Sequence, residues 1–273
     1  MLNELFLRFP DFKLRAVTFS FDDGHFEDRR MVEGFDKWGI KCTFNLDLRY
    51  MIEKENKIPV EEYPELYKNH EVASHTLTHP HLESLDDGGV VYEIIKSREM
   101  LEEVMEKPIV GFAYPYGLRD REGLVDCISK CGIVYGRTTG DTHGFAIPKD
   151  FMRWNPTCHQ SYSGFSELAE RFFVPEDTAH PWRIEPRLFY IWGHSYEFRN
   201  NWEQFDKICE TVGGKENVWY ATNIEIYNYV KAYKSLRRSA NGKYIYNPTD
   251  TDVYVWANKK NVLLKKGSMT VLE

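Results

Sequence analysis

The sequence alternates short runs of β-branched and aromatic residues with longer stretches in which apolar residues recur every three or four positions. The short runs predict strands at about residues 15–21, 41–46, 71–74, 109–114, 133–138, 187–193 and 217–221. The clearest helical stretch covers residues 88–106, where Pro108 stops it, and another covers residues 224–238. This alternation is typical of βα units that build a parallel sheet, and 273 residues suit a domain of the barrel size range.

The pattern changes after about Ser239. From there the chain consists of short apolar alternations separated by turn signals such as Asn241-Gly242 and Lys266-Gly267, with no helical period. We therefore expect two units, a main domain over residues 1–238 and a small β appendage over residues 239–273 that packs on it.

Composition excludes several classes of protein. An apolar fraction of 42% with 15% aromatic residues is enough to fill a core, which argues against intrinsic disorder. A net charge of −7 lacks the positive field that attracts nucleic acid. No stretch approaches the ~18 apolar residues of a membrane span, and the first residues lack a signal-peptide pattern. Together with five cysteines, an odd number in a large chain, this predicts a cytoplasmic protein.

Two adjacent carboxylates follow the first predicted strand, in Ser20-Phe21-Asp22-Asp23-Gly24. The carboxyl ends of parallel strands meet on one face of a barrel, so side chains far apart in sequence can converge there. Strand alternation should turn Asp22 and Asp23 apart, and a metal ion bound to one would relieve their repulsion. Taken alone, Asp-Asp-Gly is also typical of a surface turn.

Histidines follow two further predicted strands. His75 and His79 come after residues 71–74, and a spacing of four on a helical turn lets both imidazoles reach one divalent ion. His194 follows the strand at residues 187–193. One Asp with two His forms a facial triad that leaves positions open on a metal, which indicates metal-assisted hydrolysis. The second carboxylate would then be the general base, and a histidine across the site the general acid.

In order and spacing, these segments resemble the polysaccharide deacetylase family, the NodB-homology or carbohydrate esterase family 4 domain, over about residues 15 to 230. The resemblance implies a distorted (β/α)7 barrel of the NodB type, to which the small C-terminal β appendage is added. In T-F-S-F-D-D-G it implies that Asp22 is the catalytic base and Asp23 a metal ligand. His75 and His79 match the two histidine ligands of the H-S/T-x-x-H motif.

Two other motifs carry the catalytic roles further along the chain. The resemblance assigns oxyanion binding to the backbone N–H of Tyr116, in the motif Phe112-Ala113-Tyr114-Pro115-Tyr116-Gly117. It makes His194 the general acid, in the motif Ile191-Trp192-Gly193-His194. Ala113 stands where the family motif has an arginine that orients the base, and the D-x-x-D-W segment is not recognisable. We expect Arg137, at the end of the next predicted strand, to supply a cation in its place, gripping the carboxylate with a two-pronged fork.

The resemblance implies a metal-dependent hydrolase that removes N-acetyl, or alternatively O-acetyl, groups from a carbohydrate. Trp192 is expected to form an apolar wall for the acetyl methyl group, and Trp154 to form another wall of the substrate site. The cofactor is one divalent transition metal, with zinc first and cobalt or nickel as alternatives. The partner is a carbohydrate or another small acetylated substrate. Two alternative hypotheses stay open: the chain is an amidase for small cyclic amides or imides, or it is a catalytically weakened carbohydrate-binding protein.

Overall fold

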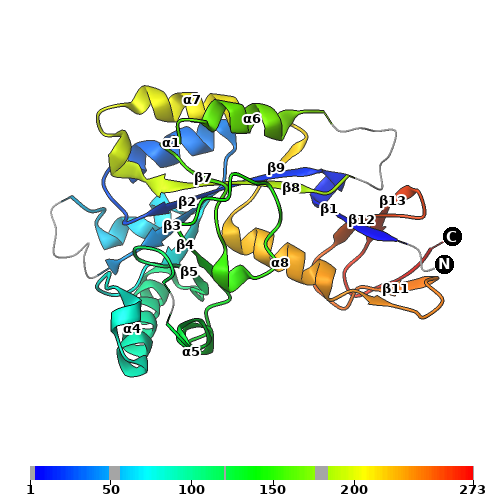
Figure 1. Ribbon diagram of the computed structural model, residues 1–273, viewed down its shortest axis with the longest axis horizontal. Coiled ribbons are helices and arrows are strands. Elements are labelled where there is room, and N and C mark those ends of the chain that lie inside the picture. The colour runs from blue at the N-terminus through cyan, green and yellow to red at the C-terminus, as the bar shows by residue number, and fades with distance from the viewer. Residues whose placement is uncertain (1–3, 49–55, 120, 176–183, 273) are drawn as a thin grey trace.

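The computed structural model describes residues 4–48, 56–119, 121–175 and 184–272, and its centre is a curled, eight-stranded parallel sheet (Figure 1). The strand order is β6-β5-β4-β3-β2-β8-β7, and β9 also pairs with β2. These strands are β2 (Arg15–Asp22), β3 (Cys42–Leu46), β4 (Glu71–Ser74), β5 (Gly111–Ala113), β6 (Tyr135–Arg137), β7 (Cys158–His159), β8 (Arg187–His194) and β9 (Val218–Tyr220). Every strand expected in residues 15–221 lies in this sheet, and the expected distorted barrel is confirmed.

Helices cover the outside of the sheet. They are α1 (Asp28–Trp38), α3 (Tyr63–Leu66), α4 (Asp87–Met105), α5 (Leu124–Lys130), α6 (Phe165–Phe173), α7 (Trp202–Val212) and α8 (Asn223–Lys234). Figure 1 shows α1, α6 and α7 together on one side of the sheet, with α4 and α5 on the opposite side.

Alternate side chains of β2 point to opposite sides of the sheet, so that one set packs in the core and the other set faces the inside of the barrel. Phe19 and Phe21 point outwards and pack on Phe35 of α1, with ring centroids 4.9 and 6.0 Å apart. The alternate residues therefore face the inside of the barrel. There the Thr18 hydroxyl donates a hydrogen bond of 2.9 Å to Asn223 at the start of α8, and Asp22 ends the row.

Helix α8 is shorter than its sequence pattern predicts. Thr222 caps its N-terminus in a capping box with Glu225, as the local sequence indicates. The helix ends at Lys234 instead of reaching residue 238, because Arg237–Arg238 form strand β10. Antiparallel pairing with the next strand, at Tyr244–Tyr246, has overridden the helical period there.

Residues 239–273 contribute strands to two three-stranded antiparallel sheets, β1-β12-β13 and β10-β11-β14. The strands are β1 (Leu5–Arg8), β10 (Arg237–Arg238), β11 (Tyr244–Tyr246), β12 (Val253–Ala257), β13 (Lys260–Leu264) and β14 (Met269–Val271). The sequence analysis did not foresee β1, which brings the N-terminal strand beside the C-terminal ones. The Tyr229 hydroxyl on α8 joins both parts, since it donates to the Arg8 carbonyl and accepts from the Tyr254 N–H. The division at residue 238 stays a prediction. In the described part of the chain, no helix combines the length and apolar character that crossing a membrane requires.

Candidate active site

Asp22 is the last residue of β2, and the sheet register places it between Asn45 of β3 and His194 of β8. Residues that pair in register on parallel strands point to the same side, so these three side chains share one end of the barrel. The Asp22 side chain is only 3% exposed. Its Oδ1 accepts a hydrogen bond of 2.8 Å from Asn45 Nδ2. Asn45 is a residue that the sequence analysis missed, although it lies in a predicted strand.

Asp23 leaves the strand with a φ of 77°, a left-handed conformation that Asp tolerates better than most residues. Its side chain therefore does not turn away from Asp22 as strand alternation predicts. His75 Nε2 lies 3.8 Å from both Asp22 Oδ2 and Asp23 Oδ1. The expectation that the two carboxylates diverge was wrong, because the backbone turn swings Asp23 back towards the same imidazole.

His75 and His79 come together without a helical turn. Thr76 and His79 have φ values of 70° and 55°, and the loop folds back so that the two imidazole centroids lie 4.7 Å apart. His79 Nε2 is 4.0 Å from Asp23 Oδ1. Two backbone N–H groups of this loop donate to the Glu93 carboxylate of α4 at 2.9 and 2.8 Å, which holds the loop in place. The two imidazoles thus lie close together, as the spacing of four predicts, but a loop and not a helical turn brings them there.

Asp23, His75 and His79 form a group that could hold a divalent ion, since their ligand atoms lie within 4.8 Å of one another. The second nitrogen of His75, Nδ1, is 2.9 Å from the Ala113 carbonyl oxygen, which can only accept a hydrogen bond. Nδ1 therefore donates to this carbonyl, and Nε2 is the nitrogen that can bind a metal. Burial, together with the nearby His75, lowers the pKa of His79 to about 4, so its imidazole is neutral. Two imidazoles and a carboxylate fit a transition-metal ion.

Arg137 reaches the site from the strand next to Ala113. Ala113 of β5 and Arg137 of β6 pair in register. The guanidinium therefore comes from the neighbouring strand, at the same height in the barrel as Ala113. Arg137 Nη2 donates to Asp22 Oδ2, and the arginine side chain is fully buried. The guanidinium also lies 4.6 Å from the Trp192 ring centroid.

The contact between Arg137 and Asp22 is made by one nitrogen, not by a fork. Arg137 Nη1 is directed to the Thr138 carbonyl at 3.5 Å, and Nε has no partner among the described residues. The expected two-pronged grip is therefore wrong, because the other Asp22 oxygen is taken by Asn45. Burial alone would raise the pKa of Asp22, but the Arg137 guanidinium and the neighbouring imidazoles lower it to about 2.

One ring nitrogen of His194 faces the carboxylates of Asp22 and Asp23, and the other faces the carboxylate of Glu197. Its Nε2 lies 3.9 Å from Asp22 Oδ2 and 4.0 Å from Asp23 Oδ2, while Nδ1 lies 3.4 Å from Glu197 Oε1. The other Glu197 oxygen is 3.2 Å from His159 Nε2. Burial alone would lower the pKa of His194, but Glu197, Asp22 and Asp23 raise it.

Glu197 and His159 were missed by the sequence analysis. Glu197 lies three residues after His194 in one short 3-10 turn, and this spacing was a usable signal. His159 belongs to the two-residue strand β7, which is too short to show a pattern. With His194, these two residues form a second group whose ligand atoms lie within 4.8 Å of one another.

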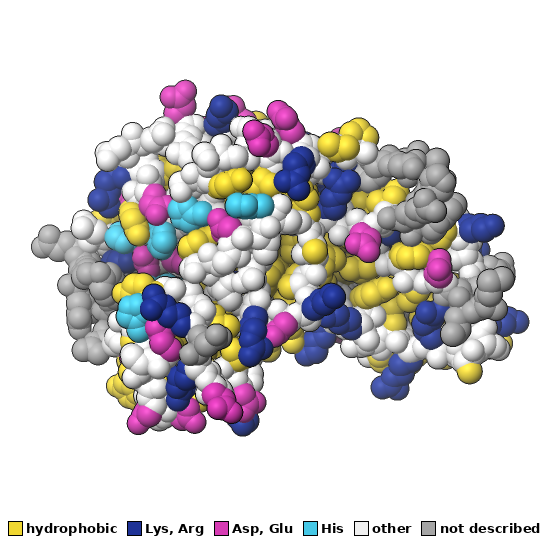
Figure 2. All heavy atoms as spheres, in the orientation of Figure 1, with side chains coloured by type: hydrophobic (Ala, Val, Ile, Leu, Met, Phe, Trp, Pro, Cys, Tyr) yellow, Lys and Arg dark blue, Asp and Glu magenta, His cyan; other side chains and the backbone are white. Residues whose placement is uncertain are grey.

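An open cleft of about 380 Å³ adjoins the carboxylates and imidazoles. Its lining comprises Asp23, His25, Asn56, Thr78, His79, Tyr116, Tyr196 and Arg199. The Tyr116 ring packs edge-on against His79, with centroids 4.6 Å apart, and its backbone has a φ of 58°. No described residue accepts a hydrogen bond from the Tyr116 N–H, which stays free to bind an oxyanion. Figure 2 shows histidine side chains gathered on the left half of this face of the molecule.

The two tryptophans expected at the site lie in different places, and neither belongs to the lining of the cleft. Trp192 stands beside His194: its ring centroid is 6.1 Å from that of His194, and its Nε1 donates to Asp141 at 2.7 Å. Trp154 is 1% exposed and packs on Tyr190 in the core. It lines a separate pocket, so the structure does not bring it to the cleft.

The family model "Polysaccharide deacetylase" matches residues 10–136 of the chain. This segment holds Asp22, Asp23, His75, His79 and Tyr116, whereas Arg137 and His194 lie beyond it. Over these residues the match agrees with the resemblance that the motifs indicate. No curated protein matches the sequence.

Two solved structures agree on the fold. A putative polysaccharide deacetylase from Mycobacterium smegmatis is 18% identical, with a TM-score of 0.57, covering 85% of this chain and 96% of that one. The Bc1960 peptidoglycan N-acetylglucosamine deacetylase is 16% identical, with a TM-score of 0.53 over 82% and 92%. The Streptococcus pyogenes deacetylase PplD is 20% identical, with a TM-score of 0.43; the match covers 45% of this chain but only 55% of PplD.

Proposed function

We propose that this chain, whose residues 10–136 match the polysaccharide deacetylase model, is a metal-dependent hydrolase that removes acetyl groups from a carbohydrate. N-acetyl groups are the first expectation and O-acetyl groups the alternative. The observation that supports this most is the convergence of three imidazole Nε2 atoms on two adjacent carboxylates. His75, His79 and His194 each have Nε2 within 4.0 Å of an oxygen of Asp22 or Asp23.

Asp23, His75 and His79 are the proposed metal ligands. Zinc is the first choice, with cobalt and nickel as alternatives, because imidazole suits all three. When bound, such an ion supplies a Lewis acid that polarises a carbonyl and lowers the pKa of water. The hydrogen bond between His75 Nδ1 and the Ala113 carbonyl supports this assignment, since partners of this kind orient metal-binding histidines.

Asp22 is the proposed general base, which accepts a proton from the attacking water as the oxygen–carbon bond forms. Its low pKa keeps it ionised at neutral pH. Asn45 and Arg137 each hold one of its two oxygens, which fixes the orientation of the carboxylate. In this role Arg137 compensates for the arginine that Ala113 replaces.

His194 is the proposed general acid. Its raised pKa favours the protonated imidazole, which gives its proton to the leaving nitrogen as the carbon–nitrogen bond breaks. The Glu197 carboxylate lies 3.4 Å from Nδ1 and attracts the protonated imidazole. The free backbone N–H of Tyr116 would donate a hydrogen bond to the oxygen that becomes negative in the transition state. Trp192 is retained as an apolar wall close to His194.

Acetate release from chito-oligosaccharides tests this function, with metal content measured in the same samples by elemental analysis. Activity that falls with metal removal and returns with zinc, and that is lost in Asp22→Asn, is the expected result. Hydrolysis of a cyclic imide such as succinimide is the parallel assay for the amidase reading. Oligosaccharide binding without turnover of any substrate would instead support the weakened carbohydrate-binding reading.

A further inference from the structure

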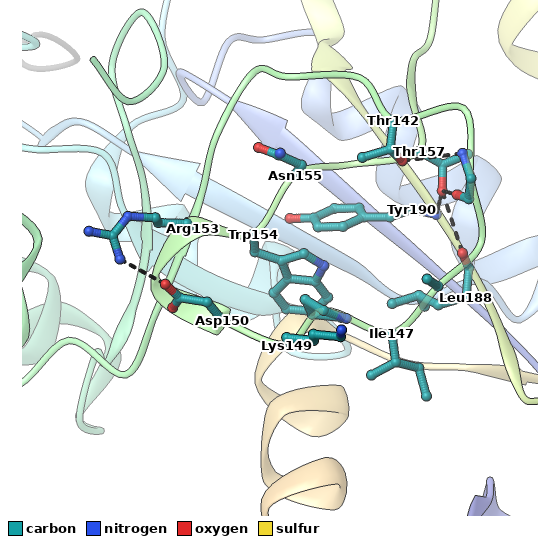
Figure 3. Close-up of a pocket in the computed structure, with 13 residues that line it drawn as sticks. Thr142, Ile147, Lys149, Asp150, Arg153, Trp154, Asn155, Thr157, Leu188 and Tyr190 are labelled. Carbon is teal, nitrogen blue, oxygen red and sulfur yellow. Dashed lines mark hydrogen bonds and ion pairs between the residues drawn. The ribbon is translucent and has the colours of Figure 1, made fainter. Parts of the chain in front are cut away.

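A second pocket of about 320 Å³ lies away from the cleft, between the loop at residues 142–150, the segment at residues 153–157 and strand β8 (Figure 3). Its inner wall is apolar, since Trp154, Leu188 and Tyr190 are all at most 2% exposed. Ile147 of the loop adds a partly buried aliphatic group. This volume is at the small end of ligand pockets and suits a molecule built around one ring.

The indole N–H of Trp154 has no acceptor. Nε1 forms no hydrogen bond with any residue that the structure describes, although the whole side chain is 1% exposed. The nitrogen is still in contact with solvent, since it is not among the fully buried polar atoms without a hydrogen-bond partner. Figure 3 shows the indole in the middle of the lining residues. A donor in so apolar a place gains free energy when a ligand oxygen accepts its hydrogen bond.

The polar rim of the pocket has one positive charge in excess. Arg153 Nη1 pairs with Asp150 Oδ2 at 2.8 Å, which neutralises both side chains. Lys149 is exposed, and no carboxylate among the described residues pairs with it. Asn155 accepts a hydrogen bond from Thr138 through Oδ1, so that its amide Nδ2 is left to donate. The pocket therefore offers unused donors and an unused cation, but no unused carboxylate.

We propose that this pocket binds a small organic carboxylate with an apolar body, a function separate from acetyl hydrolysis. The carboxylate would accept hydrogen bonds from the Trp154 indole and from Lys149, while the apolar body would lie against Ile147 and Leu188. The charge of Lys149 complements a carboxylate, and the apolar wall disfavours a bare inorganic anion. An aromatic acid has this chemistry, because it joins one carboxylate to an apolar ring.

Nuclear magnetic resonance of the indole N–H groups tests the proposal, with benzoate as the probe. Trp154→Phe identifies the Trp154 signal by its loss and keeps an aromatic ring in the core. We expect benzoate to shift this signal and to leave that of Trp219, which packs on Phe9 elsewhere, unchanged. Benzyl alcohol has the same ring without the charge and should bind more weakly. Binding of benzyl alcohol as tight as that of benzoate, or the absence of any shift, overturns the proposal.

Calorimetry of benzoate binding gives a second test that leaves the core intact. Lys149→Gln should weaken binding by about two- to fivefold, as expected for an exposed ion pair. The matched control is Lys207→Gln on α7, another exposed lysine, which should bind benzoate as the unchanged protein does. Equal affinity in the Lys149 and Lys207 variants contradicts the proposal. Glucuronate carries a carboxylate without an apolar body and should bind more weakly than benzoate; glucuronate binding that is equally tight or tighter overturns the proposal.

Discussion

Replacement of Arg137 by Lys or Ala tests how the base of the reaction is held. The guanidinium is fully buried beside an Asp22 side chain that is 3% exposed, and it reaches one carboxylate oxygen through one nitrogen. Lysine keeps a positive charge but is shorter and lacks the planar group that lies over Trp192. Alanine removes the charge and leaves Asp22 buried with Asn45 as its remaining hydrogen-bond donor on Oδ1.

The size of the effect follows from the pKa of Asp22. Burial raises it, yet Arg137 and the nearby imidazoles lower it from 3.8 to about 2. At about 1.4 kcal/mol per pKa unit, this favours the ionised carboxylate in the folded protein by about 2 kcal/mol. Because the folded pKa is the lower one, this stability is present above about pH 4 and is lost as the pH falls towards 2. Breaking a buried pair costs about 3–5 kcal/mol, which we expect for Arg137→Ala at pH 7.

Arg137→Lys should fold normally and lose roughly ten- to a hundredfold in kcat, as changes around a catalytic group commonly do. The measurements are kcat and KM for acetate release, metal content, and unfolding midpoints at pH 7 and pH 3. Arg153→Lys is the matched control, because this exposed arginine pairs with Asp150 outside the site. Unchanged kcat in both Arg137 variants would refute the reasoning. It would mean that Asp22 is held by other groups, and it would favour the amidase reading with a differently built pocket.

Four further predictions concern single side chains. His79→Ala should lose metal and activity together, and full metal occupancy by elemental analysis would remove His79 from the ligand set. Asp22→Asn should keep its metal while kcat falls by about 10²- to 10⁴-fold; loss of the metal would make Asp22 a ligand instead. Glu197→Gln should lower the pKa of His194, so that the alkaline limb of the kcat/KM profile moves to lower pH; an unmoved limb would exclude this positioning role. Burial raises the pKa of Glu71 from 4.5 to about 7, so its ionisation destabilises the fold as the pH rises through this range. Relative to the unchanged protein, Glu71→Gln should therefore gain up to about 3 kcal/mol between pH 4 and pH 8, and a pH-independent difference in denaturant unfolding would contradict this.

The sequence was informative wherever a property depends on neighbours along the chain. Seven of the eight barrel strands were predictable from short apolar runs, such as residues 15–21 and 187–193, whereas the two-residue strand β7 was not. The helical period that begins at residue 224 indicated α8 for the same reason, since the apolar spacing of a helix is a local property. The gathering of Asp22, His75 and His194 at one end followed from a general property of parallel strands, whose carboxyl ends meet.

By itself, then, the sequence determined the βα alternation and the set of polar residues at the strand ends. Only the tertiary structure decided which atoms meet, because register and loop conformation depend on packing between distant segments. Register paired Ala113 with Arg137, and competition from Asn45 reduced the arginine contact to one nitrogen. A left-handed backbone turned Asp23 towards the histidines, and β7 brought His159 to Glu197. None of these contacts produces a pattern in the local sequence, because each depends on residues that are far apart along the chain.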